Sequence, residues 1–360
     1  WIDQTIEKTI GFLQQGGTFD MSLQVTIPNE WEKLAPINIG YTAGIEATRV
    51  TPEWIQKCSE VDKIITISNF SKSIFETSRY EATNNQTGEQ FILQNTTPME
   101  VVNYPVKTYG ELPNMELNLD FDFNFLVIAQ FGPRKNLENT IKWFVEEFKD
   151  DEVGMVVKTN LAKNCVMDRE IAAGNIKKVV DSVCSSSDRK CKVYLLHGDM
   201  TDEEVHALYV HPQLKAFVAL PHGEGFGLPM FEAAYSGMPV VATGWSGQLD
   251  YLVDQNEKER FYNVSYDIQP IQEKAVWDGV LMKEAMWAYP RSSSAKTQMR
   301  RCYEDVLNNS STASQSADYA LELQERFSEE KMLQLFADAV FKPDTEVAEW
   351  LAKIDQLEEL

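Results

Sequence analysis

Two glutamates stand eight residues apart in a glycine-rich stretch of the sequence, in a position suited to binding a phosphorylated ligand. Before Glu224, residues 216–220 form an apolar run typical of a buried strand. Pro229 suits the first turn of a helix, because its missing N–H would have no partner there, and Gly237 suits the helix end. The pattern predicts a strand, a turn that carries Glu224, and a helix that carries Glu232.

The start of such a helix favours an anion, because its free N–H groups and the positive end of its dipole point into the turn. A carboxylate at a phosphate site repels the ligand unless it binds another part of it. Hydroxyl groups are the natural partner, since an ionised carboxylate accepts two hydrogen bonds from a vicinal diol. A phosphate between two polyols describes a nucleotide sugar, so we expect Glu224 to bind the sugar hydroxyls and Glu232 the ribose hydroxyls.

The stretch EGFGLPMFEAAYSGMPVVAT, with Glu224 and Glu232 at its two fixed positions, resembles the E-x7-E signature of retaining GT-B glycosyltransferases. That superfamily includes glycogen synthases and bacterial mannosyl- and glucosyltransferases. The resemblance implies that the turn and the helix start bind the donor. The donor-binding residues it implies here are Glu224, Gly225, Phe226, Gly227, Leu228 and Glu232. The alternative is an ordinary strand–helix turn with two solvated glutamates.

A pair of cations, Arg134 and Lys135, follows another buried strand and precedes another helix. Cations at a helix start are electrostatically disfavoured, so their presence there indicates a bound anion. In the resembled family an arginine and a lysine from this turn hold the donor pyrophosphate, usually several residues apart, whereas here they are adjacent. Glu224, Arg134 and Lys135 are the predicted catalytic residues, and Gly132 is predicted to contact the donor. A solvated helix start is the alternative.

Two more residues at strand ends are predicted to contact the donor. Lys158 is expected near the base, and Thr243 begins a TGWSG stretch expected to line the donor cleft through its backbone. Asp120 and Asp122 form an Asp-Phe-Asp pattern like the metal motif of a different transferase fold. Since this pattern precedes its strand, and the GT-B plan needs no bound metal, we expect no metal and no cofactor beyond the donor, a UDP- or GDP-sugar. His222 is either a supporting residue or an ordinary loop residue.

Composition excludes several classes of protein. The net charge of −22 argues against binding along nucleic acid and against unaided docking on an anionic membrane. No apolar run is long enough to cross a bilayer and no signal-peptide pattern opens the chain, so a cytoplasmic location is expected. The five cysteines and four histidines have no metal-site spacing. Cys184 and Cys191 flank one loop but are expected to be unpaired thiols.

Strands and helices alternate along the chain, which indicates α/β domains whose parallel sheets are covered on both faces. A length of 360 residues suits two such domains. The resemblance implies the GT-B plan, in which two Rossmann-like domains enclose a cleft and ligands bind at the carboxyl ends of the strands. The predicted parts are an acceptor-side domain at 1–122, a nucleotide-sugar domain at 123–338 and a C-terminal helix at 339–360. That helix packs either across onto the first domain or on its own domain.

The first domain carries a weaker resemblance to the family, in the runs GYTAGIEATRVTPEW and KIITISNFSK. In the family this region leads to the acceptor cleft, and Ser71 is expected to cap its next helix. The family usually begins with a strand and a glycine-rich turn and carries a histidine in this domain, whereas the present chain has none before His197. We expect the first domain to lack its first strand–helix units.

The predicted function is transfer of a hexosyl group from a nucleotide-diphosphate sugar to a hydroxyl acceptor. Retention of the anomeric configuration is implied by the resemblance. The acceptor is a glycan, a lipid or a small molecule, and the sequence does not distinguish among them. Two alternatives stay open. One is a nucleotide-sugar-binding subunit without transfer activity, favoured by the missing N-terminal elements, and the other is a sugar-nucleotide epimerase of the same fold.

Overall fold

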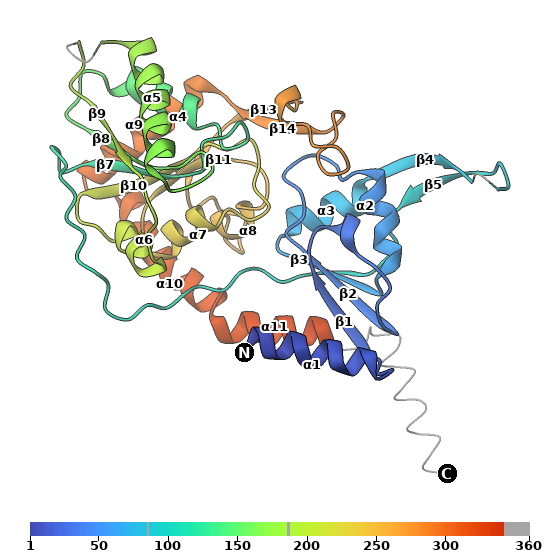
Figure 1. The fold of residues 1–360 in the computed structure, drawn as a ribbon. Coiled ribbons are helices and arrows are strands. Elements are labelled where there is room, and N and C mark those ends of the chain that lie inside the picture. Colours follow the sequence, from blue (N-terminus) through green and yellow to red (C-terminus); the bar gives the residue numbers. More distant parts are fainter. Residues whose placement is uncertain (85, 186–187, 342–360) are drawn as a thin grey trace.

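The first of two parallel sheets lies in the N-terminal part of the chain (Figure 1). The computed structural model describes residues 1–84, 86–185 and 188–341. The sheet has the order β1-β2-β3-β6. Its strands are β1 (Met21–Val25), β2 (Ile37–Thr42), β3 (Lys63–Thr66) and β6 (Met99–Val101). Helices α2 (Pro52–Lys57) and α3 (Asn69–Thr77) pack their buried side chains into the same core as Ile64 of β3.

The second sheet is also parallel and has the order β12-β11-β10-β7-β8-β9. Its strands are β7 (Asn124–Ile128), β8 (Gly154–Lys158), β9 (Lys192–Leu196), β10 (Leu214–Ala219), β11 (Val240–Thr243) and β12 (Tyr262–Val264). The helices around it are α4 (Leu137–Phe148), α5 (Val166–Val183), α6 (Asp202–Tyr209), α7 (Leu228–Tyr235), α8 (Leu249–Leu252), α9 (Ser292–Leu307) and α10 (Ser311–Arg326).

Helices cover both faces of the second sheet, which explains why its central strands are apolar on both sides. One core joins the sheet to α4, α5 and α9 through residues such as Phe144, Ile176 and Met299. The other core joins it to α6, α7 and α10 through residues such as Phe231 and Leu323. The alternating pattern predicted from the sequence is confirmed, and all loops after the strands open at one edge of the sheet.

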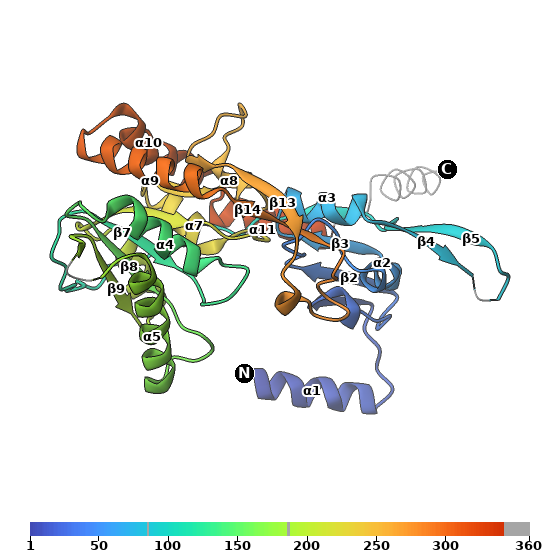
Figure 2. The ribbon, with the colours of Figure 1, turned by 90° about the horizontal axis from the view of Figure 1, so that it is seen from above.

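A hairpin that follows the second sheet in sequence packs on the first domain in space. It consists of β13 (Tyr266–Pro270) and β14 (Met286–Pro290), which pair antiparallel. Trp287 and residues of the connection between the two strands share a core with Trp31 and Trp54 of the first domain. Another hairpin, β4 (Arg79–Thr83) with β5 (Gln90–Gln94), extends away from the first sheet (Figure 2).

The C-terminal helix α11 (Glu329–Phe341) returns to the first sheet. Ala339 and Val340 pack against Ile39 and Ile65 in a shared core. The Lys63 ammonium donates a hydrogen bond of 3.0 Å to the Ala339 carbonyl. The first three residues of the predicted C-terminal helix, 339–341, are therefore the end of α11, and residues 342–360 lie outside the described residues.

The first helix, α1 (Ile2–Gln14), ends before Gly16, whose φ is +83°. None of its residues is buried. The cap of α3 differs from the prediction: Ser68, and not Ser71, is the capping residue, because the Ser68 hydroxyl accepts a hydrogen bond of 3.1 Å from the Ser71 N–H. In the part of the chain that is described, no helix is both long and apolar enough to cross a bilayer.

Residues 102–123 connect the two sheets and run along the second domain (Figure 1). The Val106 N–H donates to the Phe327 carbonyl at 2.8 Å, and Lys107 pairs with Asp202 at 2.6 Å. Near the end of this segment Asp120 pairs with Lys192 at 2.6 Å and accepts a hydrogen bond from Tyr194. Asp120 of the Asp-Phe-Asp pattern is thus used in a surface ion pair.

Candidate active site

The turn between β10 and α7 has the predicted form. Gly227 precedes α7 with a φ of +88°, a conformation that residues with a Cβ rarely adopt. α7 begins at Leu228 with Pro229 in its first turn, and the N–H groups of Met230 and Phe231 donate to the Gly227 carbonyl at 3.0 and 3.1 Å. The positive end of the α7 dipole points into the turn and favours an anion there. Gly237, with a φ of +84°, follows the helix end. These residues fix the helix start beside the carboxyl ends of β7 and β10.

Two other glycines of this turn are required for a different reason. A Cβ on Gly223 would lie 2.4 Å from the Glu46 carbonyl oxygen, and a Cβ on Gly225 would lie 2.7 Å from the Ala43 carbonyl oxygen. Neither glycine has a positive φ, unlike Gly227. The turn therefore needs glycine at these positions because the backbone of the first domain, in the loop after β2, packs directly on it.

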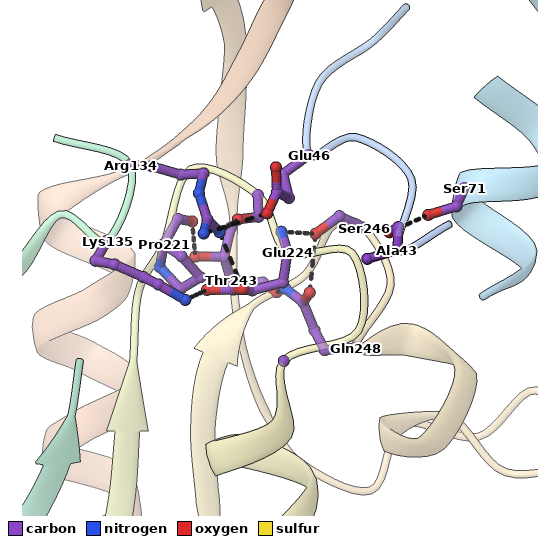
Figure 3. Close-up of polar contacts among 12 residues, drawn as sticks. Ala43, Glu46, Ser71, Arg134, Lys135, Pro221, Glu224, Thr243, Ser246 and Gln248 are labelled. Carbon is purple, nitrogen blue, oxygen red and sulfur yellow. Dashed lines mark hydrogen bonds and ion pairs between the residues drawn. The ribbon is translucent and has the colours of Figure 1, made fainter. Parts of the chain in front are cut away.

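Glu224 holds both predicted cations on one carboxylate (Figure 3). Its Oε2 lies 3.0 Å from Arg134 Nη1, and its Oε1 lies 2.5 Å from Lys135 Nζ. Burial by itself would raise the pKa of this carboxyl, but Arg134 and Lys135 outweigh burial and hold the pKa below its ordinary value. Glu224 is therefore ionised at neutral pH and balances part of the charge of the two cations.

The backbone of Glu224 is fixed from the β11 side. Its N–H donates to the Ser246 hydroxyl at 2.9 Å, and its carbonyl accepts from the Gly247 N–H at 3.0 Å. The TGWSG stretch thus holds the turn through these contacts. Thr243 is fully buried and donates to the Pro221 carbonyl at 3.0 Å, so its hydroxyl is already used inside the protein.

The turn after β7 is shaped by Asn136, which the sequence did not single out. Asn136 has a left-handed φ of +53° and its amide donates to the Leu220 carbonyl at the end of β10, at 3.0 Å. This bond ties the two turns together. It places Arg134 so that Nη1 also donates to the Gly223 carbonyl at 2.8 Å. An asparagine just before a predicted helix was the signal available, because asparagine adopts a left-handed conformation more readily than most residues with a Cβ.

Glu46, from the loop after β2, is the site residue that sequence reasoning missed. Its Oε1 lies 3.2 Å from Arg134 Nη2, so the guanidinium bridges a carboxylate from each domain (Figure 3). The weaker resemblance in the first domain included Glu46 but assigned it no role. The position of Glu46 just beyond the carboxyl end of a parallel strand was the available signal, since ligands bind at that edge.

Glu232 lies in different surroundings, one turn into α7. Its Oε2 accepts a hydrogen bond of 2.9 Å from the Tyr209 hydroxyl on α6. Burial raises the pKa of Glu232 above its ordinary value, although the Tyr209 bond and the charge of Lys107 oppose the shift. No cation within ion-pair distance of Glu232 is found among the described residues.

The remaining predicted residues lie in several places. Gly132 lines the cavity between the domains together with Arg134 and Lys135. Lys158 donates to the Gly198 carbonyl at 2.6 Å, at the neighbouring strand end. The Phe226 side chain is 2% exposed and packs in the core below α7. A donor in the turn could therefore contact the backbone of Phe226 but not its ring. Leu228 is exposed at the helix start.

His222 is a supporting residue of this site. It is buried, its Nδ1 lies 2.9 Å from the Ala288 carbonyl oxygen, and its ring stacks on Trp287 with centroids 5.5 Å apart. Burial lowers the pKa of His222, and the hydrogen bond to Ala288 only partly opposes the shift. The histidine thus joins the β10–α7 turn to strand β14, on the side of the first domain.

The arrangement suits an anion with hydroxyl groups. Two cations and a helix start converge on one place, and the carboxylates of Glu46 and Glu224 pair with the cations. A ligand phosphate can replace those carboxylates as the partner of Arg134 and Lys135. Across the described ranges, no group of three or more His, Cys, Asp or Glu side chains is arranged to hold a metal ion. Metal-independent donor binding stays a prediction.

Comparison with known families supports this description of the second domain. The family model described as "Glycosyl transferases group 1" matches residues 118–275. That range contains the second sheet, both cations and both glutamates of the E-x7-E pattern. No curated protein matches the chain.

Solved structures of low identity share the fold. The structure titled "OtsA apo structure" has a TM-score of 0.55 at 9% identity, over 85% of this chain and 68% of that chain. Anabaena HepE, solved in complex with UDP and glucose, has a TM-score of 0.53 at 12% identity, over 88% and 72%. TarM has a TM-score of 0.51 at 15% identity, over 89% of this chain and 55% of its own, so this chain spans little more than half of TarM. The chain therefore has the GT-B fold, and its residues 118–275 match the family model of the group 1 glycosyl transferases.

Proposed function

We propose that the protein transfers a hexosyl group from a UDP- or GDP-sugar to a hydroxyl acceptor, with retention of the anomeric configuration. The observation that carries this proposal is the convergence of Arg134, Lys135 and Glu224 at the start of α7. Because HepE of the same fold was solved with UDP and glucose, UDP-glucose is the first donor to test.

In this proposal the donor diphosphate becomes the partner of Arg134 and Lys135 and lies at the positive end of the α7 dipole. Glu224, released from its two cations, then accepts hydrogen bonds from hydroxyls of the transferred sugar. Glu232 accepts hydrogen bonds from the ribose hydroxyls, in exchange for its bond with Tyr209 or beside it. The support is the order of the groups along α7, with the cations at one end and the second carboxylate one turn further on.

The protein's part in the reaction is to stabilise the leaving diphosphate. As the bond from the anomeric carbon to the diphosphate oxygen breaks, negative charge develops on that oxygen. Arg134, Lys135 and the start of α7 stabilise this charge without having to reorganise. The acceptor hydroxyl bonds to the anomeric carbon on the same face, and its proton passes to the leaving phosphate oxygen. Closure of the domains excludes water, which would hydrolyse the donor.

The test is product analysis with a panel of UDP- and GDP-sugars and hydroxyl acceptors. We expect release of the nucleoside diphosphate with one donor, a product anomer that matches the donor by NMR, and loss of both in Lys135→Ala. A product of opposite anomeric configuration would overturn the retaining mechanism. Diphosphate binding by calorimetry, without release from any donor, would favour the alternative of a non-catalytic subunit.

The other alternative, a sugar-nucleotide epimerase, is distinguished in the same experiment. An epimerase converts the donor sugar in the absence of an acceptor, and NMR of the donor alone would detect that conversion. Donor binding is expected to survive EDTA, since the charge of the diphosphate is neutralised by Arg134, Lys135 and α7. Loss of the calorimetric signal on chelation would contradict the metal-free proposal. The cytoplasmic location expected from the sequence stays a prediction.

A further inference from the structure

A cavity of about 440 Å³ lies between the two domains, and Arg134 and Lys135 line one side of it. Its size falls within the range of about 300–1,000 Å³ that is usual for small-ligand sites. The loop after β2 and Trp54 form the wall on the first-domain side. The connection between β13 and β14 forms the opposite wall and includes Trp277, Val280 and Leu281. A ligand here would lie beside the proposed diphosphate position.

The polar end of the cavity is lined by Glu46, Arg134 and Lys135. In the proposed donor complex the diphosphate neutralises the two cations, so Glu46 is the charged group left for a second ligand. The Glu46 side chain is 30% exposed, and its carboxylate reaches Arg134 from the first domain. An ionised carboxylate accepts hydrogen bonds and donates none, so it favours hydroxyl groups and disfavours a phosphate or carboxylate on the ligand. The whole-chain charge of −22 adds to this preference for a ligand without negative charge.

The apolar wall offers an exposed indole on a fixed turn. Trp277 is 64% exposed although it lines the cavity, whereas Trp54 and Trp287, which line the same cavity, are buried. Reciprocal backbone bonds of 3.0 and 2.7 Å join Trp277 and Leu281. The Thr51 hydroxyl donates a hydrogen bond of 3.3 Å to the Gly279 carbonyl. This bond anchors the same turn on the first domain. A rigid aromatic face costs little entropy to present to a ligand, so this indole is prepared for a flat apolar partner.

A pyranose ring has an apolar face of C–H groups and an edge of hydroxyls. These two surfaces are complementary to the apolar wall and to the polar end of the cavity. We infer that the cavity binds a neutral carbohydrate as the acceptor, with its ring face on Trp277 and its hydroxyls on Glu46. The inference rests on the proposed transferase function. It excludes a phosphorylated sugar, because Glu46 would repel it, and an acyl chain, because it would bury the Glu46 carboxylate without a partner.

The contact between Glu46 and Arg134 makes acceptor binding depend on the donor. Arg134 Nη2 pairs with the Glu46 carboxylate at 3.2 Å. A diphosphate competes for the guanidinium and so leaves Glu46 free for hydroxyl groups. The coupling is reciprocal, so each ligand strengthens binding of the other by the same factor. The acceptor sugar is expected to bind the diphosphate complex more tightly than the free protein.

The experiment is saturation-transfer NMR on the full chain saturated with UDP or GDP, whichever binds by calorimetry. The probes are the methyl glycosides of glucose, galactose, mannose and N-acetylglucosamine, each compared with the corresponding sugar 6-phosphate. We expect at least one neutral glycoside to bind and its phosphate to bind more weakly. Trp277→Ala should weaken the glycoside about fivefold to tenfold, the loss expected for an aromatic contact. Glu46→Gln should reduce the preference for the neutral sugar.

Matched controls separate a local effect from a general one. Trp1→Ala removes another exposed tryptophan, and Glu89→Gln removes an exposed carboxylate of the first domain, and neither should change the signal. Diphosphate affinity should be preserved in Trp277→Ala, which shows that the variant is folded. The inference is overturned if no glycoside gives a Trp277-dependent signal, or if a sugar phosphate binds as well as its neutral counterpart. Absence of diphosphate binding in the unaltered protein would instead contradict the proposed function.

Discussion

Glu224 and Glu232 lie on the same strand–turn–helix unit, yet their surroundings shift their pKa values in opposite directions. Glu224 is held by two cations, which outweigh its burial and lower its pKa. Glu232 is held by a neutral phenol, and burial raises its pKa. One carboxylate balances the charge of the proposed phosphate site, whereas the other is a hydrogen-bond acceptor that lacks an ion-pair partner within the described residues. The two glutamates of the motif therefore belong to sites of different chemistry, one charged and one neutral.

The largest expected effect is on turnover in Glu224→Gln. Glu224 is proposed to position the transferred sugar, and a misplacement of about 1 Å at the reacting centre costs about 100-fold in rate. Free diphosphate should bind more tightly to this variant, because Arg134 and Lys135 lose a competing carboxylate. Steady-state kinetics and calorimetry measure the two quantities, and Glu138→Gln, at an exposed position of α4, is the control. Weaker diphosphate binding would show that Glu224 does not compete with the ligand.

Lys135→Ala should have the next largest effect. Loss of a charge-assisted bond to phosphate costs roughly 1.5–3 kcal/mol, or about 10- to 150-fold in affinity for the diphosphate. Arg134→Ala should cost the same or less, since its guanidinium is shared with Glu46. Lys142→Ala, further along α4, should change nothing. Unchanged calorimetric affinity in both cation variants would place the phosphates elsewhere in the molecule.

Glu232→Ala should weaken UDP or GDP alone and the intact donor by the same factor. Ribose contacts are similar in the ground and transition states, so their loss is a uniform loss of binding of about 1 kcal/mol or somewhat more. Calorimetry with both ligands checks the equality, and Glu203→Ala at an exposed position of α6 is the control. If Glu224→Gln loses diphosphate affinity and Glu232→Ala does not, the donor lies in the opposite direction along α7.

The smallest expected effects are on stability, and they should differ in sign. The lowered pKa of Glu224 means that its ionised form stabilises the fold above its ordinary pKa, and that this contribution is lost as the pH falls through the folded pKa. The raised pKa of Glu232 means that its ionised form costs stability above the folded pKa, and that acid relieves this cost. At pH 7, Glu224→Gln should lower the free energy of unfolding measured in urea, and Glu232→Gln should raise it by about 1 kcal/mol or less. Equal shifts in both variants would contradict the contrast.

Local sequence features predicted the unit around the glutamates correctly because its determinants are short-range. Gly227, Pro229 and Gly237 each act on the backbone next to them, and the alternation of apolar segments fixed the parallel sheet. Where two local solutions compete, the sequence was less decisive. Ser68 and Ser71 are both good capping residues three positions apart, and the prediction chose the wrong one.

What the sequence by itself determined is the fold class, the turn with its cations and carboxylates, and the family signature. The tertiary structure decided which charges meet. Glu46 reaches Arg134 from another domain, and Gly223 and Gly225 are glycines because that domain's backbone packs on them. The segment that carries Trp277 joins the core of the first domain although the sequence places it after the second sheet. The physical reason is that propensity and periodicity act over a few residues, whereas an ion pair or a close backbone approach depends on how distant segments pack.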